Sequence, residues 1–224
     1  PSRVAANTRR LLDLLDASGA KATFFTLGCV ARDHPAVVRE IANRGHEVAS
    51  HGVDHRMITE LTPAEFRTQA IESRALLEDI TGQRVIGYRA PSYSVGKATL
   101  WALEILSDVG YAYDSSVYPI RRRRYGYPEG PAVPAFLPAG KGRIAEFPLP
   151  TVALGPLRLP VLAGAYLRLL PSWLSLRTLH AHAKKGTPLV VNVHPWELDP
   201  EQPTVGPSRG PWTHYARLGA TSTT

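Results

Sequence analysis

The chain has 224 residues, of which 44% are apolar and 20% are charged, and this composition can bury one sizeable hydrophobic core. The formal net charge is +7 at pH 7 and the pI is about 9.8, which favours acidic partners. No apolar run reaches the roughly 18 residues that a membrane-spanning helix needs, so we predict no membrane span. Cys29 is the only cysteine, which excludes an intrachain disulfide.

Four consecutive arginines at residues 121–124 are the most concentrated source of positive charge. They stand beside Tyr125 and Tyr127 and not on a basic helix, and the sequence has no helix-turn-helix or RNP-like pattern. We interpret the run as a solvated loop or as a patch near an anionic glycan. The sequence therefore predicts no nucleic-acid partner.

Apolar strand-like runs alternate with amphipathic helices in the first half of the chain. The helix signals are leucines on one stripe, a proline in a first turn, a capping-box spacing and glycines just past the helix ends. In chain order, these patterns predict a helix over residues 7–17, a strand over 22–27, a helix over 35–45, a strand over 47–50, a helix over 63–80, a strand over 85–88, a helix over 97–109 and a strand over 111–113.

Residues 119–176 are richer in proline and glycine, so we expect loops over one face plus short strands, one of them near residues 144–147. A helix over residues 175–184 and a strand over 189–193 follow. The repeated βα unit is typical of a parallel sheet or barrel, and we predict one domain over residues 1–224. Because Pro1 is not an initiator methionine and the last residues form no closing element, we expect this domain to be truncated at both ends.

Polar side chains follow four of the predicted strands. His51 and His55 come after the strand at 47–50, Arg89 after 85–88, Asp114 after 111–113 and His194 after 189–193. In a parallel βα barrel, residues just after the strands gather at one rim, and that rim holds the active site. We therefore expect these five side chains to meet at one face.

His51 and His55 are four residues apart, a common spacing for metal ligands. Two nitrogen ligands, one carboxylate and an open water position describe a catalytic zinc site. A zincin protease would need a glutamate directly after the first histidine on a helix, whereas Gly52 stands there after a strand. The pair predicts a divalent metal, with Zn²⁺ as the expected ion, and argues against a protease.

Four motifs carry a resemblance to a known family: Ser-His-Gly-Val-Asp-His at residues 50–55, Arg-Ala-Pro-Ser-Tyr at 89–93, Tyr-Asp-Ser-Ser at 113–116 and Val-His-Pro-Trp-Glu at 193–197. Their order and spacing resemble the NodB-homology deacetylases of carbohydrate esterase family 4, and within it the branch found in bacterial exopolysaccharide loci with an exosortase. The resemblance implies an α/β fold with a distorted (β/α) barrel of about seven strands. It also implies a metal-dependent hydrolase that removes acetyl groups from the N-acetylated sugars of a polysaccharide or oligosaccharide.

One motif of that family is missing. The family's first strand carries two acidic residues, the catalytic base and the third metal ligand, and it should lie just before the helix near Asn7. No aspartate or glutamate precedes Asn7. Because the later motifs are intact, we expect truncation and not loss of function, and we do not expect activity from this piece alone. Asp54 is expected to hydrogen-bond locally or to orient a histidine.

The resemblance implies a catalytic role for several motif residues. His51 and His55 would hold the metal, Arg89 would anchor the absent base, and the backbone N–H of Ser92 would stabilise the oxyanion. His194 would protonate the leaving amine, with Asp114 as its partner.

Three further side chains are candidates at the edge of this site. Tyr93 and Trp196 are expected to form apolar walls for the sugar ring or the acetyl methyl group. Glu146 follows the loop-rich segment and is expected to face the site.

Two other functions fit parts of the pattern. The motifs at residues 89–92 and 113–116 also resemble an allantoinase-like hydrolase of a small cyclic amide on the same scaffold. The missing acidic motif would equally suit a glycan-binding module that kept the fold and lost the chemistry.

Overall fold

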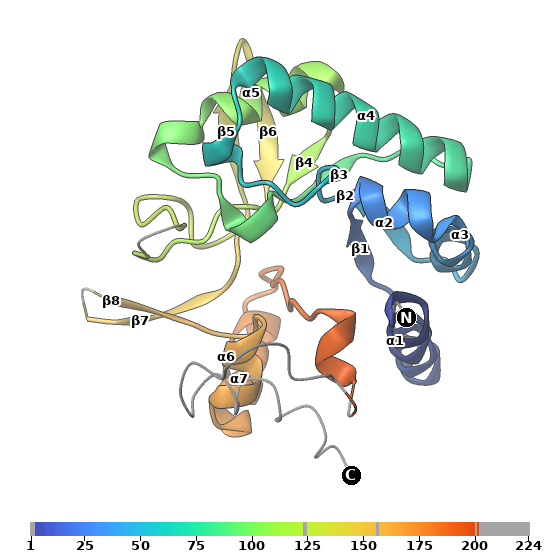
Figure 1. The fold of residues 1–224 in the computed structure, drawn as a ribbon. Coiled ribbons are helices and arrows are strands. Elements are labelled where there is room, and N and C mark those ends of the chain that lie inside the picture. Colours follow the sequence, from blue (N-terminus) through green and yellow to red (C-terminus); the bar gives the residue numbers. More distant parts are fainter. Residues whose placement is uncertain (1–2, 123–124, 156, 200, 202–224) are drawn as a thin grey trace.

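A six-stranded sheet forms the centre of the structure, a computed structural model that describes residues 3–122, 125–155, 157–199 and 201 (Figure 1). In spatial order its strands are β1 (Thr23–Thr26), β2 (Glu47–Ser50), β3 (Gly87–Tyr88), β4 (Tyr113–Asp114), β6 (Gly142–Glu146) and β5 (Ala135–Ala139). Neighbouring strands pair in parallel, except β5 and β6, which form an antiparallel hairpin. The predicted α/β class with a parallel sheet is confirmed.

Helices alternate with the strands, as the periodicity predicts. They are α1 (Val4–Ser18), α2 (Gly28–Asp33), α3 (Pro35–Asn43), α4 (Pro63–Thr81) and α5 (Trp101–Val109), with 3₁₀ turns η1 (Ile58–Glu60), η2 (Pro91–Tyr93) and η3 (Lys97–Thr99). Helix α4 begins at a capping box, in which the backbone N–H of Glu65 donates to the Thr62 hydroxyl and the N–H of Thr62 donates to the Glu65 carboxylate. Within the described residues, no helix is long and apolar enough to cross a membrane.

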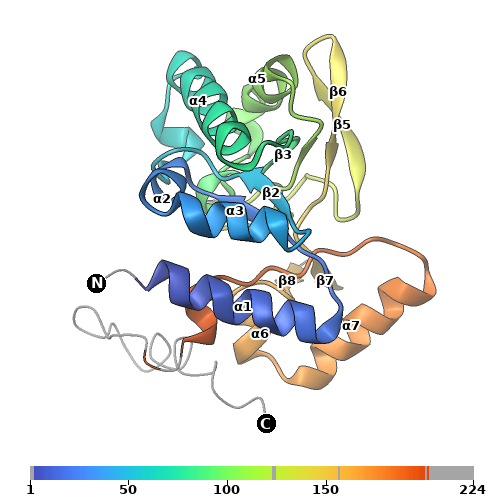
Figure 2. The same ribbon diagram turned by 90° about the vertical axis from the view of Figure 1, so that its right-hand side faces the viewer.

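The main hydrophobic core lies between the sheet and helices α2 to α5, which cover one side of it (Figures 1 and 2). The apolar stripes of these helices supply most of it, and burying each large side chain stabilises the fold by about 1.5–3 kcal/mol. The fully buried members include Val38, Phe66, Leu77, Leu103, Leu106 and Ile144. The strands are thereby held rigidly, and so are the residues at their ends.

The second half of the chain contains elements whose positions the sequence analysis did not give. Strand β5 and the hairpin of β7 (Thr151–Leu154) with β8 (Leu157–Pro160) are short strands in the segment where loops and short strands were expected. Helix α6 (Ala165–Leu169), in the same segment, was not predicted. They are followed by α7 (Ser172–Lys184) and the 3₁₀ turn η4 (Pro195–Leu198). The predicted strand near residues 144–147 corresponds to β6, and the predicted helix at 175–184 to α7.

The predicted strand at residues 189–193 is wrong. Only Asn192 pairs there, as an isolated parallel bridge to Ala163. Pro188 and Pro195 flank the segment and lack N–H donors, and Val191 is 49% exposed, so the run has neither the hydrogen bonds nor the burial of a strand. Within the described residues the main sheet is therefore open, with β1 and β5 at its edges, and is not a closed barrel.

An ion-pair cluster fixes α1 against η4, at opposite ends of the described chain. The Arg3 guanidinium donates to both carboxylate oxygens of Asp199, at 2.5 Å and 2.7 Å, and the Asn7 amide donates to the same side chain at 3.0 Å. These hydrogen bonds hold the pKa of Asp199 well below its usual range. The turn after His194 is thus tied to the first helix.

Candidate active site

The predicted residues of the first half lie at one edge of the sheet. His51 directly follows β2 and Arg89 directly follows β3, while Asp114 is the last residue of β4. The backbone continues the ladder at these points, because Arg89 N–H donates to the Ser50 carbonyl and Ser115 N–H to the Tyr88 carbonyl, both at 2.9 Å. Parallel strands end at the same edge, so the three side chains start from neighbouring positions.

His51 and His55 form a close pair, with ring centroids 5.2 Å apart and the rings inclined at 73°. The Nδ1 atom of His51 lies 2.6 Å from the carbonyl oxygen of Arg89, which makes Nδ1 the protonated nitrogen and leaves the lone pair on Nε2 free. Burial lowers the pKa of His51 to about 3, and charges on His55, Arg89 and His194 act in the same direction. His51 is therefore neutral, and His55 is its direct ring neighbour.

The loop that carries His55 has an unusual backbone. His55 is exposed and has φ of 64°, a left-handed conformation that costs a residue other than glycine free energy. Asp54 accepts hydrogen bonds from the backbone and side chain of Arg56 and from Gln69. Asp54 thus hydrogen-bonds locally. In the part of the chain that the structure describes, no three His, Cys, Asp or Glu side chains gather as a metal site.

Arg89 is a buried cation that contacts neutral groups. Its guanidinium donates to the carbonyl and the hydroxyl of Ser115 and, at 2.6 Å, to the side-chain oxygen of Asn192. It also lies over the Phe25 ring at 4.0 Å. Among the described residues it forms no ion pair, and these three hydrogen bonds use three of the five N–H groups of a guanidinium.

Asp114 and Glu146 form a buried carboxyl pair below the edge. They are register partners on β4 and β6, both are fully buried, and one oxygen of each has no hydrogen-bond donor among the described residues. Burial raises the pKa of both carboxyls, and the neighbouring Asp114 carboxylate raises that of Glu146 further. At Asp114, hydrogen bonds from Ser116 and nearby backbone N–H groups oppose the effect of burial on the pKa. Glu146 therefore takes the shared proton, and Asp114 keeps the negative charge.

This pair predicts a stability that depends on pH. A carboxyl whose folded pKa is raised contributes stability that is full below its unfolded pKa, near 4.3, and is lost as the pH rises through the folded value. The free energy of unfolding should thus fall above pH 5, by about 1 kcal/mol per pH unit. Glu146→Gln, which supplies an N–H donor to Asp114, should flatten that decline in urea titrations. The exposed control Glu104→Gln should not, and an unchanged slope in Glu146→Gln would contradict the shared proton.

His194 has a different partner from the one predicted. Its Nδ1 atom lies 2.9 Å from Oε1 of Glu197, whose other oxygen forms a buried 2.7 Å ion pair with Arg168 on α6. Asp114 is instead buried with Glu146 and bonded to Ser116. Asp114 lies within β4 below the edge, whereas Glu197 is three residues after His194 in the turn η4, so its carboxylate reaches back to the imidazole.

Two residues complete the surroundings of His194. Trp196 stacks on the imidazole, with ring centroids 5.9 Å apart at 23°, and Arg168 lies over the indole. Gly164 has φ of 51°, and a Cβ atom there would stand 3.6 Å from Oε1 of Glu197. The Cβ would thus fit in ordinary contact, and it is the backbone conformation at Gly164 that favours glycine.

Glu197 is expected to be a positioning residue for His194. Glu197→Ala removes the acceptor that orients the imidazole, so in the full-length natural protein any turnover that depends on His194 should fall by about tenfold to a hundredfold. Glu197→Gln keeps an oxygen that can accept from Nδ1–H, so it should recover most of that loss. Equal turnover in all three proteins would contradict the role, and circular dichroism melting curves separate it from a loss of fold.

A cavity of about 430 Å³ opens beside these residues. Ser92, Tyr93, Asn192 and His194 line it, together with Met57, Tyr118, Tyr125, Ala163, Gly164, Ala165 and Tyr166. Ser92 and Tyr93 both have left-handed backbones, with φ of 53° and 52°, and such strain tends to occur at functional sites. Of the two predicted wall residues, Tyr93 lines the cavity and Trp196 does not.

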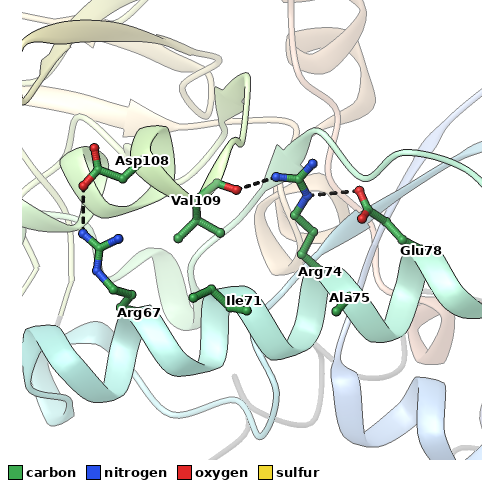
Figure 3. A pocket seen from close by; sticks show the side chains of 7 residues that line it. All are labelled: Arg67, Ile71, Arg74, Ala75, Glu78, Asp108 and Val109. Atoms are coloured by element: carbon green, nitrogen blue, oxygen red, sulfur yellow. Dashed lines mark hydrogen bonds and ion pairs between the residues drawn. The ribbon is translucent and has the colours of Figure 1, made fainter.

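A second hollow, of about 350 Å³, lies between α4 and α5 and shares no lining residue with the first (Figure 3). Its polar side chains are occupied with one another: Arg67 pairs with Asp108, and Arg74 donates to Glu78 and to the Val109 carbonyl. These contacts therefore belong to the packing of α4 and α5.

Sequence reasoning missed several residues of this site. Glu197 was within a quoted motif, and its three-residue offset from His194 was a usable signal. Asn192, Tyr118 and Tyr166 had no signal, because they meet only when β4, α6 and the bridge at Ala163 are in place.

Comparisons with known proteins agree with these motifs. Residues 2–113, half of the chain, match the family described as polysaccharide deacetylase, and residues 115–223 match a domain of unknown function, DUF3473. A peptidoglycan deacetylase-like protein, FGM2, from Gibberella zeae is 34% identical over 110 residues, which are 48% of this chain and 32% of the relative. The peptidoglycan-N-acetylglucosamine deacetylase of Bacillus cereus is 34% identical over 98 residues, 43% of this chain and 36% of the relative.

The chain spans about a third of the length of these two curated relatives. Among solved structures, a Mycobacterium smegmatis protein named as a polysaccharide deacetylase superposes with a TM-score of 0.65 and 25% identity, covering 84% of this chain and 63% of that one. The boundary between the two matched families falls at β4, so His51 and Arg89 come from the first and His194 from the second. On the family match over half its length and this shared fold, the chain belongs to the polysaccharide deacetylase family.

Proposed function

We propose that the protein containing this chain is a metal-dependent hydrolase that removes acetyl groups from the N-acetylated sugars of a polysaccharide. The observation that carries the proposal is a close pair of imidazoles, His51 and His55, at the strand edge, together with an oriented His194 that lines the cavity, in a chain of the deacetylase family. The whole protein's substrate and metal are part of this proposal.

The two histidines fit a zinc ion. Two imidazoles on one tetrahedral Zn²⁺ have ring centroids about 5 Å apart, given Zn–N distances of about 2.0–2.1 Å. The centroids of His51 and His55 are 5.2 Å apart. The hydrogen bond from His51 Nδ1 to the Arg89 carbonyl is the kind of outer contact that orients a metal-binding imidazole. Within the described residues no third His, Cys, Asp or Glu joins the pair, and the family resemblance implies that a carboxylate is the third ligand.

When bound, such a metal polarises an amide carbonyl and lowers the pKa of a water molecule toward about 7. The chain's own residues supply the remaining functions. Arg89 has N–H groups left to anchor a carboxylate that acts as the base, as the family resemblance implies. The left-handed turn at Ser92 presents its backbone beside the cavity, where an N–H would stabilise the developing oxyanion.

His194 is the group that would protonate the leaving amine. An amine leaves poorly unless it takes up a proton, and imidazole is the side chain best suited to give one near neutral pH. Glu197 accepts from Nδ1, so Nε2 is the atom that can deliver the proton. The imidazole is 48% exposed and lines the cavity, so a substrate can reach it.

The test is acetate release by the natural protein in its full length. N-acetylglucosamine oligomers are compared with small ureides such as allantoin, before and after metal removal with a chelator. Release from the oligomers alone, lost on chelation and restored by Zn²⁺, supports the proposal. Hydrolysis of ureides alone would favour the cyclic-amide hydrolase, and binding of oligomers without any hydrolysis would favour a glycan-binding module.

A further inference from the structure

The cavity beside His194 has walls suited to a sugar ring. Tyr93, Tyr118, Tyr125 and Tyr166 line it. Tyr118 packs edge-on against Tyr93 at 5.5 Å and stacks on Tyr125 at 6.3 Å, so the rings hold one another in place. Aromatic faces combined with hydroxyl groups offer both apolar contact and hydrogen bonds, which carbohydrates need from a binding site.

Tyr118 has a polar atom that the protein itself does not satisfy. The side chain is 2% exposed, and its buried Oη has no hydrogen-bond partner among the described residues. Buried polar groups in folded proteins are almost always hydrogen-bonded, so an unpaired hydroxyl in a cavity wall indicates a ligand or water partner. The amide nitrogen of Asn192, in the same wall, also lacks a hydrogen bond of good geometry, although the Tyr93 hydroxyl is near it.

A cation stands at the rim of this cavity. Among the described residues no aspartate or glutamate lines the cavity, and Glu197, which contacts the lining residue His194, is ion-paired with Arg168. The Arg122 guanidinium donates at 2.9 Å to the hydroxyl of the lining residue Tyr166. Arg121 and Arg122 are exposed, so their charges face the solvent from which a ligand arrives. A cation at the rim of a cavity whose only neighbouring carboxylate is already ion-paired, among the described residues, attracts an anionic ligand and repels a cationic one.

We propose that this cavity takes a sugar bearing a carboxylate, so that the substrate is an acidic glycan in which a uronate neighbours the N-acetylated residue. The N-acetylated residue beside the uronate rests on the proposed function. The binding of a carboxylate-bearing sugar in the cavity does not. Arg122, held by Tyr166, pairs with the carboxylate at the rim, and the Tyr118 hydroxyl bonds a ring oxygen or hydroxyl inside. Four tyrosines form the surrounding wall.

The experiment compares two forms of one ligand by calorimetry on the full-length natural protein, with EDTA present to prevent turnover. The ligand is a hexasaccharide of alternating N-acetylglucosamine and glucuronate, and its matched control is the same hexasaccharide with its carboxyl groups reduced to alcohols. The acidic form should bind about fivefold more tightly, the upper range for a solvent-exposed ion pair. Arg122→Gln should bring this ratio to about one, whereas Arg67→Gln, an arginine on α4 paired with Asp108, should preserve it.

Two further variants separate the contacts. Tyr166→Phe removes the hydroxyl that holds Arg122 and should lower the ratio of the affinities for the acidic and the reduced hexasaccharide. This variant keeps the proposal testable if Arg122→Gln does not fold. Tyr118→Phe should weaken both forms by a similar factor, about threefold to tenfold, and leave the ratio unchanged.

The results that would contradict the acidic-glycan proposal differ from those that would contradict the hydrolase. Equal affinity of the two forms for the unaltered protein, or a ratio lost equally in Arg67→Gln and Arg122→Gln, would overturn the acidic-glycan proposal. Acetate release from neutral N-acetylglucosamine oligomers alongside such a result would leave the hydrolase standing. A clear preference for the acidic form without acetate release from any glycan would overturn the hydrolase and leave the acidic subsite.

Discussion

His194→Ala should lower the turnover of the full-length natural protein on N-acetylated glycans by about two to four orders of magnitude, because it removes the proposed general acid. The leaving amine would then depart without a proton from the protein. The structure supports this effect, since His194 lines the cavity and its Nδ1 is held by Glu197, which fixes the ring. The measurement is kcat from acetate release under saturating substrate.

The control for this variant is His180→Ala. His180 is exposed on α7, bonds the Leu176 carbonyl one turn earlier and does not line the cavity. It should keep its turnover within about twofold, as expected of a surface substitution. Zinc affinity should be unchanged in both variants. Turnover in His194→Ala equal to that of the unaltered protein would remove His194 from the mechanism.

His51→Ala should abolish zinc binding. Replacing an outer partner of a metal ligand commonly costs 10–100-fold in affinity, so losing a ligand itself should cost more than about a hundredfold. The side chain is held for this role, since its Nδ1 contacts the Arg89 carbonyl and its Nε2 is free. Calorimetric titration with Zn²⁺ gives the affinity, and the rise in melting temperature on adding Zn²⁺ gives an independent readout.

His180→Ala again provides the matched loss of one imidazole and should leave the zinc affinity unchanged. His55→Ala should resemble His51→Ala, because the two rings are neighbours. An unaltered zinc affinity in His51→Ala would exclude this pair as the metal site. A variant that no longer binds zinc but keeps the melting curve of the metal-free protein shows that the loss is local.

The site depends on contacts that cross the boundary between the two matched families. Arg89, from the first, donates to Asn192 and Ser115 of the second, and Asp199 near the end of the described chain is bonded by Arg3 and Asn7 of α1. The second segment is therefore structurally part of the site. The cavity itself is lined by residues on both sides of β4.

The bounds of strands and helices were predicted well where the local sequence patterns are strong. The strand at residues 47–50 agrees with β2 at both ends, and the capping box at Thr62 starts α4 where predicted. These signals are local, since alternation, proline in a first turn and a side chain reaching three residues along the chain need no distant contact. The positions of His51 and Arg89 follow directly from them.

Predictions from the same kind of local pattern failed in the second half of the chain. The run at residues 189–193 has the β-branched composition of a strand, but only Asn192 forms a bridge, because flanking prolines and exposure limit its pairing. Asp114 was expected to serve His194, yet β6 brings Glu146 against it in register. The strand near residues 144–147 was predicted, but its place beside β4 was not. Which carboxylate lies beside which histidine depends on the order of the strands in the sheet, and the sequence does not reveal that order.

The sequence by itself determined the alternation of helices and strands, the motif residues at the strand ends and the family, because these depend on periodicity and on short spacings along the chain. Only the tertiary structure decided that Glu197 contacts His194, that Asp114 is buried against Glu146 and that four tyrosines line a cavity. Some of these residues are far apart in sequence, and others are close in sequence but differ in how deeply they are buried. Their contacts and their burial arise only once the sheet, α6 and η4 have packed together.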